Sequence, residues 1–206
     1  MKLLHRLALV VLSLSALAAH ASADPVKYTL DKSHTEVGFN IRHFFSRVHG
    51  RFNDFDGTIV FDDKNPANIS VDATAQTKSI WTDNDRRDAH LRSPDFFYAD
   101  TFTTLSFKST KVTPAGDKKY KIAGDLTMRG VTKPVVFDAE FLGAGQVGMG
   151  GRAMGAKAGF TATTVVNRQD YGIKWNKALD SGGMMLDDNV TIVINVEGNA
   201  EAPTSK

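Results

Sequence analysis

The stretch Ile69-Ser70-Val71-Asp72-Ala73-Thr74-Ala75-Gln76 places an apolar side chain at every second position, with a polar one between. Successive side chains of a β-strand point to opposite faces, so this period of two predicts a strand with one buried and one solvated face. Along the buried face, large side chains give way to two alanines. The stretch therefore predicts an antiparallel sheet whose inner face leaves free space beside it.

Similar alternating runs precede and follow this stretch. They cover residues 26–30, 37–45 and 51–61 before it, and 102–112, 120–128, 135–141, 154–164 and 190–196 after it. The run over 51–61 has apolar residues on both parities, which predicts a β-bulge near Asp54 to Gly57. Nine strand candidates with one helical passage predict an all-β fold.

Long strands that follow one another with local connections favour a closed antiparallel barrel over a sandwich of short strands. Closure also removes the exposed edges that such strands would otherwise leave. We therefore expect an extended eight-stranded antiparallel barrel, whose interior holds either packed side chains or one slender ligand. Alanines at 73, 75, 156, 158 and 162, on the faces expected to point inward, favour the ligand.

The one helical segment is expected over residues 82–97. Thr82 and Asp85 have the spacing of a capping box, and Arg92 falls in the last turn, where a cation is favoured. Ser93-Pro94 stops this helix and can start a second short turn. So short a helix must pack on the barrel, and it is either a solvated connection or a polar lid over the cavity.

The first residues are typical of an export signal. Lys2 and Arg6 precede an apolar run from Leu7 to Ala19, and Ala21-Ser22-Ala23 fits a signal peptidase site. We expect residues 1–23 to be a signal peptide cleaved after Ala23, residues 24–206 to be a single domain, and the protein to be periplasmic. The chain contains no cysteine, so its stability must come from the core rather than from disulfides.

Charge and motifs exclude several functions. The chain has 25 basic and 23 acidic residues, and loss of Lys2 and Arg6 makes these numbers equal, so no nucleic-acid partner is expected. Gly143-Ala-Gly145-Gln-Val-Gly148 matches a dinucleotide fingerprint, but no helix pattern follows it, and we interpret it as a hairpin loop. The four histidines after residue 23 form no HxH or HExxH pair, so neither a metal nor another cofactor is expected.

Four segments of the chain together resemble the YceI family. They are His34-Thr-Glu-Val-Gly-Phe-Asn-Ile-Arg-His43, Gly50-Arg-Phe-Asn-Asp-Phe-Asp-Gly57, Arg87-Asp-Ala-His-Leu-Arg-Ser-Pro-Asp-Phe96 and Gly124-Asp-Leu-Thr-Met-Arg-Gly-Val-Thr-Lys-Pro-Val135. The likeness continues through Asn167-Arg168-Gln-Asp170-Tyr171-Gly172 to the last strand. The resemblance implies a lipocalin-like barrel, typically periplasmic, that holds a polyisoprenoid or a similar long-chain amphiphile.

On that basis we expect the protein to bind and carry an isoprenoid quinone, a polyprenyl phosphate or a similar lipid in the barrel lumen. The apolar residues expected to line the lumen are Val37, Phe39, Ile41, Ile69, Val71, Leu126, Val135, Phe137 and Phe160. The polar residues expected to bind the head group are Arg42, His43, Arg87, Asp88 and His90.

Two alternatives remain open from the sequence. One is an enzyme in which His90 and Asp88 act as base and orienting group on a lipid in the same cavity, although we expect no enzyme because no nucleophile occurs at a recognisable spacing. The other is a barrel with a packed interior and no ligand. Besides the lipid, the partners to consider are inner-membrane proteins in transient contact and a second copy of the chain.

Overall fold

The computed structural model describes residues 25–62 and 64–202, so the expected signal peptide lies outside the described residues. Eight antiparallel strands form a closed ring. In spatial order they are β1 (Val26–Leu30), β4 (Phe55–Phe61), β5 (Ser70–Gln76), β7 (Thr104–Pro114), β8 (Lys119–Met128), β9 (Val131–Met149), β10 (Arg152–Asn167) and β11 (Leu186–Ala200). Pairing of β1 with β11 closes the ring, and the predicted eight-stranded antiparallel barrel is confirmed.

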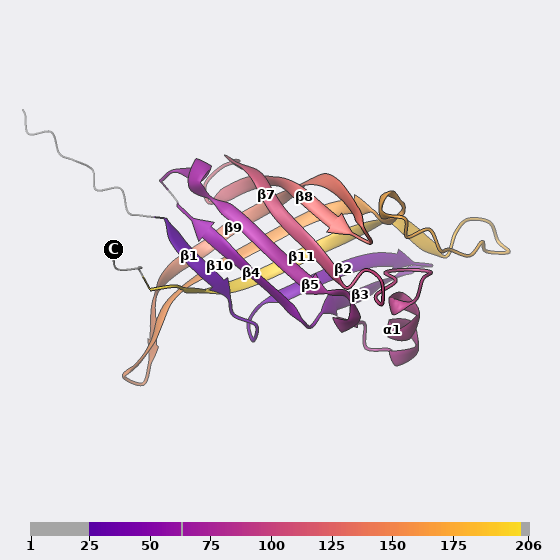
Figure 1. Cartoon of the computed structure of the whole chain (residues 1–206), viewed down its shortest axis with the longest axis horizontal. Coiled ribbons are helices and arrows are strands. Elements are labelled where there is room, and N and C mark those ends of the chain that lie inside the picture. Colours follow the sequence, from indigo (N-terminus) through magenta and orange to yellow (C-terminus); the bar gives the residue numbers. More distant parts are fainter. Residues whose placement is uncertain (1–24, 63, 203–206) are drawn as a thin grey trace, which may run out of the picture.

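Three further strands extend the sheet from β11 at one end of the barrel. They are β2 (Glu36–His43), β3 (Ser46–Phe52) and β6 (Ile80–Trp81). The C-terminal end of β11 pairs with β1, and the part of β11 from Leu186 to Asn195 pairs with β2. Strands β1 and β2 therefore lie end to end along the same edge of β11. Figure 1 shows this extension at the end of the molecule that also carries α1 (Asp85–Arg92).

Two of the predicted runs were wrong because each contains a turn that the alternation did not indicate. The run over 51–61 is not one bulged strand, because β3 ends at Phe52 and β4 begins at Phe55. Asn53 and Asp54 form the connection between them, and such residues favour turns because their side chains hydrogen-bond locally. The run expected over 37–45 ends at His43, and Phe44 and Phe45 form a tight turn into β3.

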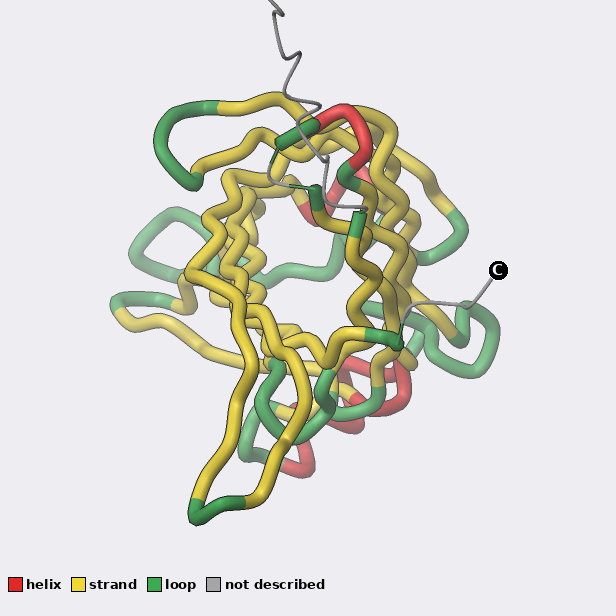
Figure 2. Tube along the Cα trace, turned by 90° about the vertical axis from the view of Figure 1, so that its left-hand side faces the viewer, coloured by secondary structure: helices red, strands yellow, loops and turns green. Residues whose placement is uncertain are grey.

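The glycine-rich stretch from Gly143 to Gly148 is also not a loop. It belongs to β9 and pairs with β10 as far as the Met149–Arg152 pair, so the turn is formed by Gly150 and Gly151. No helix follows it, as expected. Strand β8 pairs with β9 only up to Glu140, and the remaining part of the hairpin projects beyond the barrel, as Figure 2 shows.

Helix α1 is shorter than the expected segment. Asn84, not Thr82, caps its N-terminus by accepting a hydrogen bond from the Arg87 N–H. Residues 93–97 form hydrogen-bonded turns rather than a second helix, with the Phe96 N–H donating to the Ser93 carbonyl. None of the helices in residues 25–62 and 64–202 is long and apolar enough to cross a membrane.

Candidate functional site

The barrel encloses a cavity of about 940 Å³. Alternation along each strand turns one set of side chains toward this space, and most of that set is apolar. Among the residues expected to line the lumen, those in its wall are Val37, Phe39, Ile41, Ile69, Val71, Leu126, Phe137 and Phe160. The cavity is thus a tunnel with a largely apolar wall, to which β2, β4, β5, β7, β8, β9, β10 and β11 all contribute.

Small side chains leave much of this space open. Ala73 and Ala75 of β5, Ala139 of β9 and Ala162 of β10 lie in the cavity wall. Ala158 is buried in the cluster at the end of the barrel farther from α1, whereas Ala156 lies on the projecting hairpin and does not border the cavity. The alanines at the middle of the strands therefore widen the tunnel.

Val135 is an exception among the residues expected to line the lumen. It has the inward parity of Phe137, but it is absent from the cavity wall and packs against a core cluster that contains Phe96, Leu126 and Met128. Alternation predicts the face on which a side chain lies. How far the free space reaches along that face depends on the neighbouring elements.

Aromatic rings line the end of the cavity farther from α1. The ring centroids of Phe61 and Phe141 are 4.4 Å apart, and Phe160 lies 5.3 Å from Phe61 and 5.4 Å from Phe141. Tyr120 packs against Phe61 with the ring centroids 5.9 Å apart. All four border the cavity, so this end offers a ligand an apolar surface.

The other end of the cavity is polar and lies beside α1. His43 of β2, together with Asn84, Arg86, Arg87 and His90 at or on the helix, lies in its wall. Arg86 was not among the residues expected to bind a head group, yet its exposed side chain has no hydrogen-bond or ion-pair partner among the described residues. The sequence did not indicate that Arg86 borders the cavity, because adjacent residues on a helix point in different directions and Arg87 was already expected to face the cavity.

Two of the expected head-group residues do not border the cavity. The Arg42 Nε donates to Asp187 over 3.2 Å, and its Nη1 donates to the Phe44 carbonyl over 3.1 Å, which places the guanidinium outside the tunnel. Asp88 is only 2% exposed, and its carboxylate accepts a 2.5 Å hydrogen bond from the Thr82 hydroxyl. Asp88 therefore anchors the start of the helix to the strand before it.

Arg87 shares this anchor and also reaches the cavity. Its Nε donates to Thr82 Oγ1 over 2.7 Å, and its Nη2 donates to the Thr82 carbonyl over 2.5 Å. Thr82 thus holds both Arg87 and Asp88 by its side chain and backbone. The cavity surface that Arg87 contributes is fixed in place rather than free to follow a ligand.

His90 does not pair with Asp88. Its Nε2 lies 2.9 Å from an Asp95 carboxylate oxygen, and its ring packs edge-on against Phe96 and Trp175, with centroids 5.0 and 4.8 Å away. The pair of His90 and Asp88 proposed for the enzyme alternative is therefore not formed. Helical spacing could not predict that His90 pairs with Asp95, because Asp95 lies beyond the helix and the turn after the helix brings it to His90.

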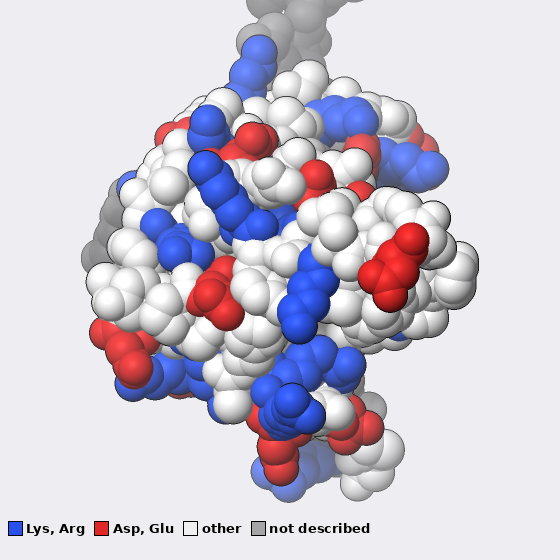
Figure 3. Space-filling view, turned by 90° about the vertical axis from the view of Figure 1, so that its right-hand side faces the viewer, with Lys and Arg blue, Asp and Glu red and all other residues white. Residues whose placement is uncertain are grey.

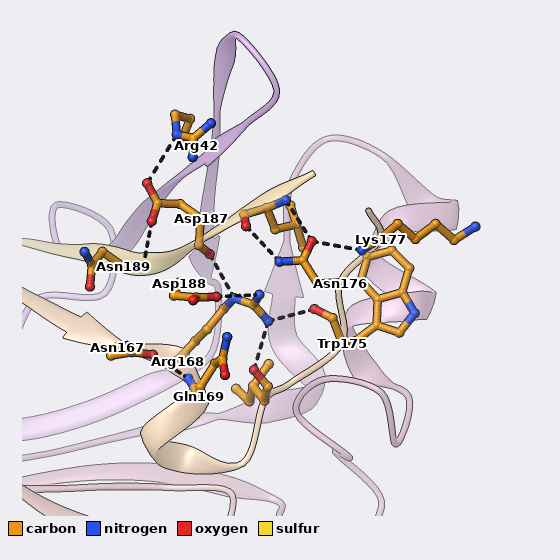
Figure 4. A network of polar contacts seen from close by, with 12 residues as sticks. Arg42, Asn167, Arg168, Gln169, Trp175, Asn176, Lys177, Asp187, Asp188 and Asn189 are labelled. Carbon is orange, nitrogen blue, oxygen red and sulfur yellow. Dashed lines mark hydrogen bonds and ion pairs between the residues drawn. The ribbon is translucent and has the colours of Figure 1, made fainter. Parts of the chain in front are cut away.

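A buried arginine shapes the loop beside this polar end, as Figure 4 shows. Arg168 Nε donates to the Asp187 carbonyl, Nη1 donates to the carbonyls of Ile173 and Trp175, and Nη2 pairs with Asp188 over 3.1 Å. Burial lowers the pKa of Arg168, and the charge of Asp188 opposes that shift. The network ties the segment that follows β10 to the start of β11, so Trp175 is held at the cavity wall.

Tyr171 lies in the same segment, and its buried hydroxyl has no hydrogen-bond partner among the described residues. Burial raises its pKa to about 12. The ring is part of the core cluster at this end of the barrel, so the residue serves packing.

One group of side chains has the composition of a metal site. Asp31, His34 and Glu197 lie close enough together to share an ion. The Lys157 ammonium already lies between the carboxylates, 2.9 Å from Asp31 and 2.6 Å from Glu197. Hydrogen bonds from Lys157 and then His34 hold the pKa of Asp31 well below its usual range. The group is therefore an ion-pair network that joins β1, β10 and β11.

Comparison with known proteins agrees with this architecture. The YceI-like domain model matches residues 28–198. The chain belongs to the YceI family. Protein YceI of Escherichia coli O6:H1 is 39% identical over 187 residues, which span 89% of this chain and 92% of that protein.

Solved structures show the same barrel. A crystal structure of the Campylobacter jejuni YceI protein is 35% identical, with a TM-score of 0.64 over 85% of this chain and 98% of that one. A polyisoprenoid binding domain from Saccharophagus degradans, implicated in plant cell wall breakdown, has a TM-score of 0.59 at 13% identity and covers 84% of this chain and 98% of its own. The second likeness shows a shared fold.

Proposed function

We propose that the protein holds one polyisoprenoid, or a similar long-chain amphiphile, in the barrel lumen and carries it through the periplasm. The observation that carries this proposal is the apolar cavity of about 940 Å³. Ligand sites commonly measure about 300–1,000 Å³. A packed, ligand-free barrel would not retain so large a space, because the side chains around it lose contacts that a bound chain restores.

The long apolar tunnel suits a chain rather than a compact ligand. Each CH₂ group removed from water contributes about 0.8 kcal/mol, so several isoprene units would bind tightly without any catalytic or charged group. The aromatic end formed by Phe61, Phe141 and Phe160 would receive the tail. The relative whose name refers to polyisoprenoid binding supports this class of ligand through its shared fold.

The polar end beside α1 suits the head group. Arg86, Arg87, His43 and His90 place hydrogen-bond donors and positive charge there, which fits a phosphate or a quinone oxygen. Of the head-group residues expected from the sequence, Arg42 and Asp88 already have other partners outside the tunnel. We therefore assign the head-group role to the residues that border the cavity.

Binding without catalysis is the activity that this geometry favours. Asp88 anchors α1 through Thr82, and His90 pairs with Asp95, so the proposed base and orienting group serve separate contacts. The proposed periplasmic location rests on the signal peptide expected over residues 1–23. Contacts with inner-membrane proteins would serve loading and delivery of the lipid.

Mass spectrometry of an organic extract of the purified protein would identify the bound lipid. One pair of variants tests whether that lipid lies in the cavity. Ala162→Leu adds side-chain volume at the cavity wall, whereas Thr163→Leu adds volume on the exposed face next to it. We expect Ala162→Leu to lower lipid retention about tenfold or more, because it excludes two or three CH₂ groups at about 0.8 kcal/mol each. Equal lipid content in folded samples of the two variants would contradict the proposal.

A further inference from the structure

The turn between β2 and β3 exposes two phenylalanines. His43 pairs with Ser46, so Phe44 and Phe45 alone form the loop, and Phe45 is fully exposed while Phe44 is 37% exposed. Two-residue hairpin loops in which only the first central residue adopts positive φ favour glycine at that position. Phe44 has φ +52°, a region that bulky residues rarely occupy. Folding alone would favour another pair at this turn.

The strands behind this turn carry positive charge. Strands β2 and β3 contain three arginines and two histidines, and their one acidic residue, Glu36, lies at the end of β2 farthest from the turn. Arg42 and Arg47 lie directly opposite one another, an arrangement that costs stability because like charges repel. Asp187 pairs with Arg42, whereas exposed Arg47 has no partner in residues 25–62 and 64–202. One unpaired cation thus lies immediately behind the exposed rings.

The exposed turn is continuous with the mouth of the cavity. The Phe44 N–H donates to the Met185 carbonyl over 3.0 Å, which joins the turn to the loop before β11, and Met184 of that loop is 48% exposed. His43 packs its ring against Phe44 at a centroid distance of 4.3 Å, and both His43 and Met185 border the cavity. The tip therefore directly contacts residues of the cavity wall.

We propose that the tip formed by Phe44, Phe45 and Met184 inserts into the head-group region of an anionic lipid bilayer, with Arg47 contacting lipid phosphates. Aromatic rings beside a cation are suited to the membrane interface, and basic residues are attracted to anionic lipid. The cavity mouth then meets the membrane, so a chain passes between bilayer and lumen without crossing water. This inference rests on the proposed lipid-holding function.

Area and charge both favour a bilayer over a second copy of the chain. A stable protein interface buries at least about 1,000 Å², whereas a tip of two phenylalanines and one methionine presents much less. The unpaired positive charge of Arg47 would also meet the same charge across a symmetric contact of two tips. Figure 3 shows further Lys and Arg side chains across this end of the molecule, among acidic ones. A bilayer surface satisfies the rings and the cation together.

Flotation with lipid vesicles tests the inference on the purified protein. Phe44→Gly combined with Phe45→Asn places glycine at the position of positive φ, as such turns prefer, so the variant should fold at least as stably as the wild type. With vesicles of phosphatidylethanolamine and phosphatidylglycerol, we expect its binding to fall about tenfold or more, because the rings no longer leave water. Leu142→Asn, which alters an exposed apolar side chain on the distant β9–β10 hairpin, should leave binding unchanged.

The charge is tested separately. Arg47→Gln should weaken binding about fivefold on anionic vesicles and leave binding to phosphatidylcholine vesicles unchanged, since each cation near the surface contributes about 1 kcal/mol. Arg152→Gln, at the far hairpin, should have no effect. Undiminished flotation of the folded Gly-Asn variant would overturn the inference, as would a wild-type dimer that the same variant converts to a monomer.

The lipid content of the same samples separates this inference from the proposed function. Loss of flotation with the bound lipid retained supports docking by the tip. Wild-type protein that retains lipid but does not float would overturn docking while leaving the binding function intact. Wild-type protein that floats through the tip but yields no lipid would refute the binding function instead.

Discussion

At the scale of single residues, Arg168 shows how a buried charge can serve structure. It is 3% exposed, yet each of its side-chain nitrogens donates to an oxygen, and three of the four acceptors are backbone carbonyls, two of them in the loop after β10. A planar guanidinium carries several N–H donors in a fixed arrangement and can reach several carbonyls at once, whereas the single ammonium group of a lysine cannot.

We expect Arg168→Met to lower the free energy of unfolding by about 3–5 kcal/mol, because it leaves the carbonyls of Ile173, Trp175 and Asp187 without their donor. Arg168→Lys should also destabilise, since it keeps the charge but loses most of the donors. Urea denaturation measures both, and Arg152→Met at an exposed position serves as the control. A lysine variant as stable as the wild type would show that charge alone matters.

Gly50 gives a second prediction at this scale. A Cβ atom at this position would lie 2.4 Å from Cζ of Phe39, so the phenylalanine ring packs directly over the glycine of the neighbouring strand. Gly50→Ala should push this ring toward the lumen and cost about 1–3 kcal/mol, as overpacking does. Denaturation measures the cost, and lipid content should fall with it. A variant with unchanged stability and lipid content would contradict this account.

At the scale of elements, α1 is attached by Thr82 rather than by its own apolar residues. Leu91 packs against the core, but the buried residue of the helix is Asp88, whose charge is matched by the Thr82 hydroxyl and by the helix N-terminus. Arg92 adds hydrogen bonds from its last turn to the carbonyls of Lys78 and Ile80. The helix is thus fixed at both ends and forms a rigid wall beside the cavity mouth.

This geometry predicts a scaffold role for Asp88. Asp88→Ala should lower the free energy of unfolding by about 1–3 kcal/mol, because the buried Thr82 hydroxyl loses its acceptor. The head group of the bound lipid should not change. Asp85→Ala, in the exposed first turn, should cost no more than about 1 kcal/mol. If Asp88→Ala kept full stability but selected another head group, its side chain would belong to the binding site.

At the scale of the whole molecule, the barrel is closed by few pairs between β1 and β11, and the network of Asp31, Lys157 and Glu197 lies at this seam. Contact with both carboxylates raises the pKa of Lys157, and the lysine lowers that of Asp31. A carboxyl group with a lowered pKa stabilises the fold above its unfolded pKa of about 3.9 and loses that contribution as the pH falls through the folded pKa.

Acidification should therefore weaken the closure. We expect the free energy of unfolding to fall between about pH 5 and pH 2, and Asp31→Asn to reduce this slope because its amide does not titrate there. Denaturation midpoints at several pH values measure the effect, and Asp117→Asn in an exposed turn is the control. Equal loss of stability in the wild type and in Asp31→Asn would place the acid sensitivity elsewhere.

Local pattern was sufficient for much of the fold. Alternation predicted most strands and the inward face of Phe39, Phe137 and Phe160, because side-chain direction in a strand depends only on position along that strand. Long strands with local connections predicted the barrel, the inward alanines predicted free space inside it, and the resemblance to the YceI family agreed with both. The turns at Phe44-Phe45 and Asn53-Asp54 were not predicted, because apolar residues continue on both sides of each turn and the run resembles one uninterrupted strand.

What the sequence by itself determined was therefore the strand content, the inward faces, the position of the helix and the family. The tertiary structure alone decided which partners the polar side chains take. Arg42 pairs with Asp187, far away in the chain, and Lys157 with Asp31, because barrel closure and strand register bring these residues together. Register and closure depend on the packing of all strands at once, so no local period encodes them.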